Sequence, residues 1–229
     1  MSDPQQASLF EDAPAISPQQ WEQIPTNPNV PILPGTYKTL EQLTHHCRQC
    51  QRCELAQTRT QVVVSRGNPD ADIMIIGEAP GQSEDEQGLP FVGKSGQLLD
   101  KILASVELNP EKDVYISNIV KCRPPQNRNP STREINACKS YLLEQINLIQ
   151  PKIILLTGTT ALKGLTGEKK GISKIRGQWL EWEGYWAMAI FHPAYLLRNP
   201  SREKGKPKWL MWQDIQAVKE KLEEIQQHN

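Results

Sequence analysis

Short, almost continuously apolar segments alternate with amphipathic ones from about residue 39 onward. Apolar runs bounded by Gly, Pro or polar residues are typical of strands that helices cover on both faces. Stretches with apolar residues every three or four positions predict the helices between them. We expect strands at Ile73–Ile76, Val114–Val120, Ile153–Leu156 and Ala187–Phe191. We expect helices at Ser95–Val106, Thr132–Ile149, Thr160–Leu165 and Lys208–Gln226.

This alternation predicts an α/β fold with a parallel-type sheet and crossover helices. Ser131 followed by Glu134 forms a capping box at the start of the second expected helix. Trp179–Trp182 and Tyr185–Trp186 flank a turn and predict a small hairpin before the last core strand. Ligands bind beyond the carboxyl ends of parallel strands, so the chemistry is expected in the loops that follow them.

Residues 1–37 differ from the rest, because they are rich in Pro, Gln, Ser and Asp and show no sustained periodicity. This composition predicts a disordered tail, with residues 38–229 forming one folded domain. The chain has no net charge, yet the first Lys or Arg is Lys38. Residues 1–37 therefore carry −4, and residues 38–229 carry 26 − 22 = +4. The mildly basic folded part permits a local phosphate-binding face.

The tail contains the peptide Gln6-Ala-Ser-Leu-Phe10. It resembles the short peptide by which bacterial DNA-maintenance proteins bind the replication sliding clamp. Two apolar anchors on a flexible segment suit docking into a groove. A chance apolar pair in a tail is the alternative interpretation.

The chain has no apolar run near 18 residues and no signal-peptide pattern, so the sequence favours neither a membrane span nor secretion, and we expect a cytoplasmic protein. In that reducing compartment five cysteines are not expected to form a disulfide framework. Instead, Cys50-x-x-Cys53 with the distant Cys122 and Cys138 is a pattern by which a zinc ion or an iron–sulfur cluster joins remote segments. Cys47 and Cys50 form a second CxxC pair.

A glycine-rich loop follows the first expected strand, from Gly77 to Gly96. Its glycines allow the backbone to approach a ligand closely, and its N–H groups suit an anion or a carbonyl. The loop fits neither a Walker A pattern nor GxGxxG, which disfavours nucleotide phosphates. Phe91 in this loop belongs either to the core or to a surface that stacks on a flat ligand.

Polar residues end two further strands. Asn118 follows a buried segment, and an unpaired buried amide costs about 1–3 kcal/mol. It therefore either caps a turn or pairs with an amide or imide edge of a ligand. His192, followed by Pro193, has either a structural role or the task of stabilising a developing anion with a hydrogen bond or a positive charge.

Taken together, these segments closely resemble the family 4 uracil-DNA glycosylases. The resemblance covers roughly residues 40–225 in order, and it rests on the spaced cysteines and on four motifs: Glu78-Ala-Pro-Gly81, Pro90-Phe91-Val-Gly93, Asn118-Ile-Val-Lys-Cys122-Arg-Pro-Pro and His192-Pro-Ala-Tyr195. It implies a three-layer sandwich in which helices flank a central four-stranded parallel sheet. It also implies a monofunctional hydrolase that cuts the N-glycosidic bond of uracil in DNA and leaves an abasic site for base excision repair.

The resemblance further implies a 4Fe-4S cluster held by Cys50, Cys53, Cys122 and Cys138, with Cys47 outside the ligand set. Zinc with the same ligands is the alternative. Such a cluster would fix the loop after Asn118 relative to the N-terminal helix.

Roles for the pocket residues come from the same resemblance. Phe91 is expected to stack on uracil, and Asn118 to read its O4 and N3–H edge. The backbone N–H of Ala79 and the side chain of His192 are expected to bind the O2 side. Well-known members of the superfamily have Asp where this chain has Ala79. Water activation is therefore left to Glu78 or Glu84, each of which has the alternative role of a loop cap. Asn127, a further polar loop residue, is expected to position water or a phosphate.

Contacts to DNA are expected on both sides of the pocket. Leu196 or Leu197, with Arg198, resembles a wedge that enters the minor groove and fills the gap left by a flipped base. A helix turn that packs its leucine inward is the alternative. Backbone contacts are expected from Lys94, Ser95, Arg128 and Arg198.

Two other classes of protein fit part of the pattern. A noncatalytic iron–sulfur or zinc DNA-binding module would keep the cysteines and the basic loops, but it has no need of Phe91, Asn118 and His192 at three strand ends. A thiol oxidoreductase is disfavoured, because the CxxC pair does not lie at a recognisable strand-to-helix start. We expect a monomer that acts on single- or double-stranded uracil-containing DNA.

Overall fold

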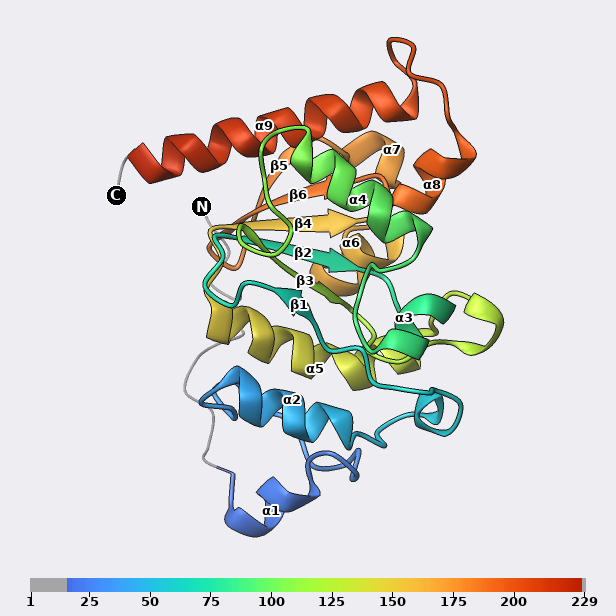
Figure 1. Ribbon diagram of the computed structural model, residues 1–229. Coiled ribbons are helices and arrows are strands. Elements are labelled where there is room, and N and C mark those ends of the chain that lie inside the picture. The colour runs from blue at the N-terminus through green and yellow to red at the C-terminus, as the bar shows by residue number, and fades with distance from the viewer. Residues whose placement is uncertain (1–15, 228–229) are drawn as a thin grey trace.

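The computed structural model describes residues 16–227, and its centre is one mixed six-stranded sheet (Figure 1). The strand order is β1-β3-β2-β4-β6-β5. The four inner strands β3, β2, β4 and β6 are parallel, and a short antiparallel strand closes each edge. The bounds are β1 Arg66–Gly67, β2 Ile73–Gly77, β3 Val114–Asn118, β4 Ile153–Thr157, β5 Trp179–Trp182 and β6 Tyr185–Ile190. The predicted four-stranded parallel core is confirmed, and the predicted hairpin is β5–β6.

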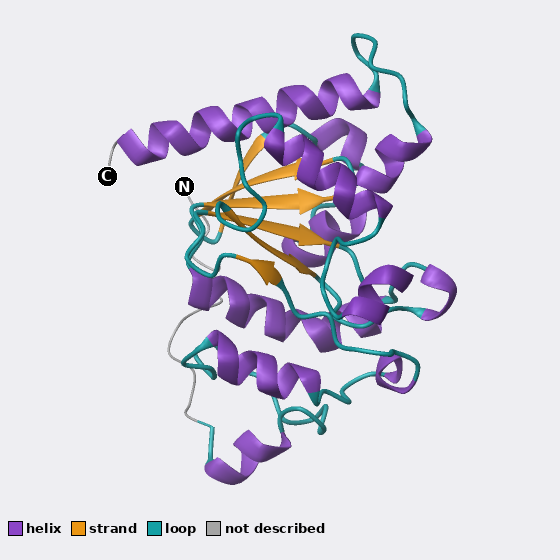
Figure 2. Cartoon of the chain, in the orientation of Figure 1, coloured by secondary structure: helices purple, strands orange, loops and turns teal. Residues whose placement is uncertain are grey.

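Helices cover both faces of this sheet (Figure 2). The α-helices in the described part of the chain are α1 Pro18–Gln23, α2 Leu40–Arg48, α3 Gln82–Gln87, α4 Lys94–Ala104, α5 Thr132–Ile149, α6 Thr159–Thr166, α7 Ile172–Ile175, α8 Pro193–Arg198 and α9 Pro207–Gln227. Two 3-10 turns lie at Glu54–Gln57 and Pro125–Asn127. None of the helices in residues 16–227 has both the length and the apolar character that a membrane span requires.

Successive side chains of each strand point to opposite faces of the sheet, and this alternation produces two hydrophobic cores. Met74 and Ile76 of β2 face one core, which includes residues of α2, α5 and α6, whereas Ile73 and Ile75 face the other, which includes residues of α4, α8 and α9. All five residues of β2, β3 and β4 are buried, which explains the almost continuously apolar sequences of β2 and β4. β3 is buried as well, although it ends in the polar residues Ser117 and Asn118. The predicted three-layer α/β sandwich is confirmed.

The predicted capping box also forms. The Ser131 hydroxyl accepts a hydrogen bond from the Glu134 N–H at 3.3 Å, and the Glu134 carboxylate accepts one from the Ser131 N–H at 2.6 Å. The box fixes the start of α5, the helix that carries Cys138.

The structure differs from the predicted disordered tail over residues 16–37. This segment contains α1, and the apolar side chains of Ile24, Val30, Ile32 and Tyr37 are buried. A residue far away in the sequence holds its backbone. The carboxylate of Glu144 accepts hydrogen bonds from the N–H groups of Gly35 and Tyr37, both at 2.9 Å. The prediction was wrong here because these apolar residues follow no helix or strand period. The clamp-like peptide Gln6–Phe10 lies outside the described residues.

One more side chain anchors this segment. The guanidinium of Arg52 donates to the carbonyl oxygens of Ile24, Asn27 and Val30 at 2.8–3.0 Å. Arg52 lies in the Cys50-to-Cys53 turn, so the N-terminal segment packs beside the cysteines.

Candidate functional site

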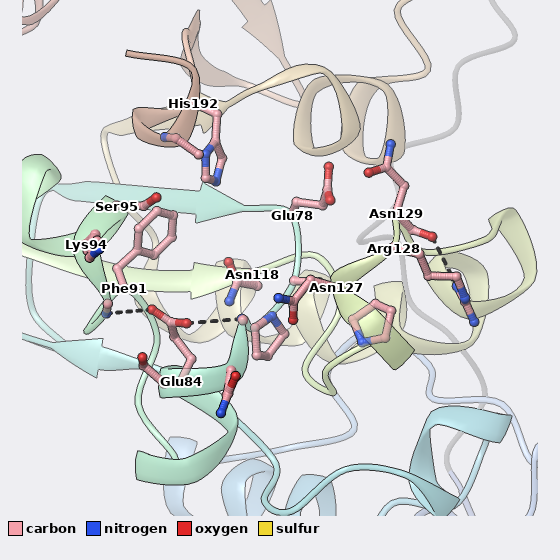
Figure 3. A pocket seen from close by; sticks show the side chains of 18 of the residues that line it. Glu78, Glu84, Phe91, Lys94, Ser95, Asn118, Asn127, Arg128, Asn129 and His192 are labelled. Carbon is pink, nitrogen blue, oxygen red and sulfur yellow. Dashed lines mark hydrogen bonds between the residues drawn. The ribbon is translucent and has the colours of Figure 1, made fainter. Parts of the chain in front are cut away.

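A cleft of about 580 Å³ opens at the carboxyl ends of the parallel strands. It brings together eleven of the residues that the sequence analysis selected: Glu78, Ala79, Glu84, Phe91, Lys94, Ser95, Asn118, Asn127, Arg128, His192 and Arg198. Figure 3 shows the side chains of Phe91, Asn118 and His192 directed toward one space, with Glu78 at its side. These residues come from loops and strand ends that are up to 198 − 78 = 120 positions apart in the sequence, so only the fold places them at one site.

Phe91 is held in an unusual backbone conformation. Its φ is 55°, in the left-handed region that non-glycine residues rarely adopt, and its side chain is 6% exposed. The backbone of Gly96 lies against it, since a Cβ at Gly96 would approach the Phe91 carbonyl oxygen to 1.8 Å. A Cβ at Gly77 would lie 2.6 Å from the phenyl ring. Two glycines of the loop therefore make room for Phe91 rather than for a phosphate group.

Asn118 is the last residue of β3 and pairs in register with Gly77 of β2. Its side chain is 2% exposed and borders the cleft. Its backbone carbonyl accepts a hydrogen bond from the buried Lys121 ammonium at 2.6 Å. Its side-chain amide makes no hydrogen bond with any residue in 16–227, so both its donor and its acceptor are available to a ligand.

His192 caps the amino end of α8. Its Nδ1 accepts a hydrogen bond from the Ala194 N–H at 3.1 Å, so the neutral ring carries its proton on Nε2. Burial, and secondarily the nearby Arg198 charge, lowers the pKa of His192 to about 4. At neutral pH it is therefore an uncharged donor. The ring is stacked near that of Phe91, with centroids 5.9 Å apart and an interplanar angle of 29°.

Glu84 holds the glycine-rich loop together. One carboxylate oxygen accepts from the N–H groups of Val92 and Gly93 at 3.0 and 2.8 Å, and the other from the N–H of Gly81 at 3.1 Å. These contacts match the loop-cap alternative for Glu84. A carboxylate that is occupied by three N–H donors is poorly placed to take a proton from water.

Glu78 and Asn127 remain free to act in the cleft. Glu78 accepts a hydrogen bond from the Thr160 hydroxyl of α6 through one oxygen only. The side-chain Oδ1 of Asn127 accepts a hydrogen bond from the Arg123 Nε at 2.7 Å, which leaves the side-chain nitrogen Nδ2 of Asn127 available. Asn127 itself is exposed and has a φ of 55°.

The residues expected to bind DNA differ in their surroundings. Lys94 and Ser95 form the first turn of α4, at the edge of the cleft. Arg128 is bound by the Glu134 carboxylate through two contacts of 2.9 and 2.6 Å, and these hydrogen bonds lower the pKa of Glu134 to about 2.

The two leucines of α8 are also distinct. Leu196 is 1% exposed and packs in the core, as the inward-packing alternative states, whereas Leu197 is 43% exposed. Neither leucine borders the cleft itself.

All five cysteines border one small cavity between α2, α5 and the loop after β3. Arg52, Arg59 and Lys121 border the same cavity, so three cationic side chains surround the thiols. Burial raises the pKa of the Cys122 thiol to about 11, whereas Arg59 acts in the opposite direction. In residues 16–227 no three His, Cys, Asp or Glu side chains already stand in a metal-binding arrangement.

Hydrogen-bond donors around this cavity fit an anionic sulfur-rich group. Arg59 Nη1 donates to Cys122 Sγ at 3.4 Å, and the Lys121 N–H to Cys138 Sγ at 3.3 Å. The buried side-chain atoms that lack a hydrogen-bond partner in the described residues are Arg52 Nε and the Tyr141 hydroxyl. Arg52 borders the cavity, and Tyr141 lies on α5, three residues after Cys138. Sulfur atoms of a bound cluster would accept from such donors.

Comparison with known proteins identifies the family. The model of the uracil DNA glycosylase superfamily matches residues 64–216, which include the cleft from Glu78 to Arg198. The chain belongs to this superfamily. The chain is also 43% identical over 182 residues to a type-4 uracil-DNA glycosylase of Thermotoga maritima, and the matched region covers 79% of this chain and 93% of that protein. It is 39% identical over 191 residues to the type-4 enzyme of Saccharolobus solfataricus, covering 80% and 86%.

Two residues that contact the site of this superfamily member were not predicted from the sequence. Thr160 belongs to no motif, yet its hydroxyl donates to Glu78. Arg123 lies inside the motif that begins at Asn118, but no role was expected of it, and its Nε donates to Asn127. One signal could have identified Thr160 as a site residue: it begins the expected helix that follows a parallel strand. Such positions lie at the edge of the sheet where ligands bind.

Proposed function

We propose that this protein hydrolyses the N-glycosidic bond between uracil and deoxyribose in DNA and leaves an abasic site, the first step of base excision repair. Membership of the superfamily and the names of the type-4 relatives support this proposal. The observation that carries it is the meeting of an aromatic ring, an unpaired amide and a neutral imidazole, from Phe91, Asn118 and His192, in one cleft.

Recognition of uracil follows from these three side chains. Uracil in a duplex is stacked and paired, so it must leave the helix to enter the cleft. Phe91 supplies a face on which the base stacks. The Asn118 amide donates to O4 and accepts from N3–H, whereas cytosine presents a donor and an acceptor in the opposite order. A mismatch of buried donors and acceptors is a strong basis for discrimination.

Catalysis requires stabilisation of the departing base. When the C1′–N1 bond breaks, its electron pair goes to uracil, and negative charge develops on O2. We assign the O2 contacts to His192 Nε2–H and to the Ala79 N–H, which makes no hydrogen bond within residues 16–227. A single donor of this kind is worth about 3–4 kcal/mol in other enzymes. A neutral imidazole serves this purpose without leaving a buried charge before reaction.

Water attack is assigned to Glu78. The sugar becomes electron-poor as the base leaves, and a carboxylate near it stabilises that charge and takes a proton from the attacking water. The Thr160 hydroxyl orients the Glu78 carboxylate. Water oxygen forms the new bond to C1′, and the uracil anion takes up a proton from solvent. Asn127 has a free amide nitrogen with which to position the water.

Contacts to DNA surround this chemistry. We assign the wedge to the exposed Leu197, with Arg198 next to it, and not to the buried Leu196. Lys94 and Ser95 offer a charge and N–H groups at the start of α4 for a phosphate. Arg128, at the opposite side of the cleft, is paired with Glu134 and offers a phosphate its remaining N–H donors.

We assign a 4Fe-4S cluster to Cys50, Cys53, Cys122 and Cys138. When bound, the cluster would cross-link the turn after α2, the loop after β3 and α5. The Lys121 ammonium, which binds the Asn118 carbonyl, lies between this centre and the cleft. The sliding-clamp peptide, the monomeric state and the cytoplasmic location stay predictions from the sequence.

One experiment tests the function. Oligonucleotides with a single uracil, cytosine or thymine are incubated with the protein, and abasic sites are revealed by alkaline strand cleavage. We expect cleavage only at uracil. Tight binding to the DNA without any release of uracil would instead support the noncatalytic DNA-binding module.

A further inference from the structure

The positive charge of the folded part is concentrated in one short segment. Residues 198–208 contain Arg198, Arg202, Lys204, Lys206 and Lys208 and one acidic residue, so their net charge is 5 − 1 = +4. This equals the entire excess of residues 38–229, which is 26 − 22 = +4. Basic and acidic residues therefore balance over the rest of that range.

This segment consists of the loop between α8 and α9, residues 199–206, with the last residue of α8 and the first two of α9. Figure 1 shows the loop extending away from the sheet beyond α8. Arg198, Arg202, Lys204 and Lys206 are exposed. None of their side chains forms an ion pair or hydrogen bond with another residue in 16–227. The loop nevertheless has a defined turn, because the Lys206 N–H donates to the Glu203 carbonyl at 3.0 Å and Gly205 has a φ of 79°.

The loop continues directly from the proposed DNA-facing helix. α8 carries His192 at its amino end and the exposed Leu197 near its carboxyl end. Arg198, the last residue of α8, borders the cleft and directly precedes the loop. A duplex with its uracil in the cleft and Leu197 at the gap would therefore extend past this loop.

We propose that the α8–α9 loop, residues 199–206, is a second DNA-contact surface that binds phosphates of the duplex flanking the extruded uracil. The inference rests on the proposed function and deepens it. The chemistry favours DNA over an acidic protein, because residues 199–206 contain no large apolar side chain. Protein interfaces depend on buried aromatic or aliphatic anchors, whereas phosphates require only positive charge and hydrogen-bond donors.

The test compares two variants with the same change in charge. Lys204→Gln/Lys206→Gln removes two loop cations, and Lys101→Gln/Lys112→Gln removes two exposed lysines from the end of α4 and from the segment before β3. Affinity for a uracil-containing duplex several helical turns long is measured over a series of salt concentrations. We expect the slope of log K against log salt to fall by about 1.8 in the loop variant, about 0.9 per lysine, and to stay unchanged in the control.

A second substrate separates this surface from the catalytic site. A single-stranded trinucleotide with a central uracil lacks the flanking duplex whose phosphates the loop is proposed to bind. Both variants should release uracil from it at the rate of the unmodified protein. An unchanged salt slope in the loop variant would overturn the inference, and so would equal losses on the trinucleotide and the duplex. Failure of the unmodified protein to release any uracil would instead refute the proposed function.

Discussion

The Nδ1 atom of His192 accepts a hydrogen bond from the N–H of Ala194, two residues further along the chain, at 3.1 Å. This contact commits the ring to one tautomer, with its proton on Nε2. The same ring is buried beside Phe91, which keeps it neutral. The histidine thus offers a fixed donor to the cleft, whereas a charged imidazolium would lose its acceptor for the helix N-terminus.

The stability of the protein should depend on pH through this histidine. The pKa of His192 is about 4 in the folded state and about 6.5 in an unfolded chain. Below pH 6.5 the unfolded chain binds a proton that the folded state excludes. The contribution of the neutral His192 to the free energy of unfolding is therefore fully present above pH 6.5 and is lost as the pH falls toward 4. The free energy of unfolding from urea titrations should fall by about 2–3 kcal/mol over this range.

His192→Gln is the control for that titration, since Gln has no titratable group. The decrease between pH 6.5 and 4 should be smaller in the variant by the amount given above. An equal decrease in both proteins would contradict the neutral state assigned to His192.

Asn118 should control which base is released. Asn118→Ala is expected to lower kcat/KM for uracil by about 100-fold, because the base loses a paired edge worth about 2–3 kcal/mol. Asn118→Asp should also lose uracil release but should gain weak release of cytosine, since a carboxylate accepts from the cytosine amino group. Abasic-site formation on matched oligonucleotides measures both. Unchanged uracil release by Asn118→Ala would refute the pocket assignment.

Glu78 and Glu84 should respond differently to the same substitution. Glu78→Gln is expected to lower kcat by at least about 100-fold with little change in stability, because it removes the proton acceptor. Glu84→Gln is expected to lower the free energy of unfolding by about 1–3 kcal/mol, because it places an amide donor against backbone donors. Single-turnover kinetics and urea unfolding separate these effects. The reverse pattern would return water activation to Glu84.

The neighbouring leucines of α8 offer a matched pair. Leu196→Ala should destabilise the fold by about 2–5 kcal/mol, the usual cost of a cavity at a buried leucine. Leu197→Ala should leave stability within about 0.5 kcal/mol, because the side chain is exposed. It should slow uracil release from a duplex and leave the single-stranded substrate unaffected, since no gap has to be filled there. Equal rates on the duplex for Leu197→Ala and the unmodified protein would exclude the wedge.

The cysteines divide into ligands and a bystander. Cys138→Ser should remove most of the bound iron and the broad visible absorbance, whereas Cys47→Ser should retain both. Iron, sulfide and zinc content per chain, measured on protein purified without oxygen, checks the assignment. Zinc without iron in the unmodified protein would establish the alternative metal, and loss of iron in Cys47→Ser would change the ligand set.

Much of the fold could be predicted from the sequence because local and global signals agree. β2 and β4 have almost continuously apolar sequences because each is buried on both faces. The α5 start was recognisable from Ser131 and Glu134 because a capping box is a contact within four residues. Residues 16–37 were missed because their order depends on Glu144 and Arg52, which lie far away in sequence and mark no period.

The sequence by itself determined the layered α/β fold, the family, and the residues that meet at the strand ends, because these follow from short-range patterns and the geometry of parallel sheets. Tertiary structure decided which role each of several chemically equivalent residues has. Leu196 and Leu197 differ only in how α8 packs on the core, and Glu84 became a loop cap because the chain folds back to bring Val92 and Gly93 against it. Roles of this kind depend on contacts between segments, which no local pattern encodes.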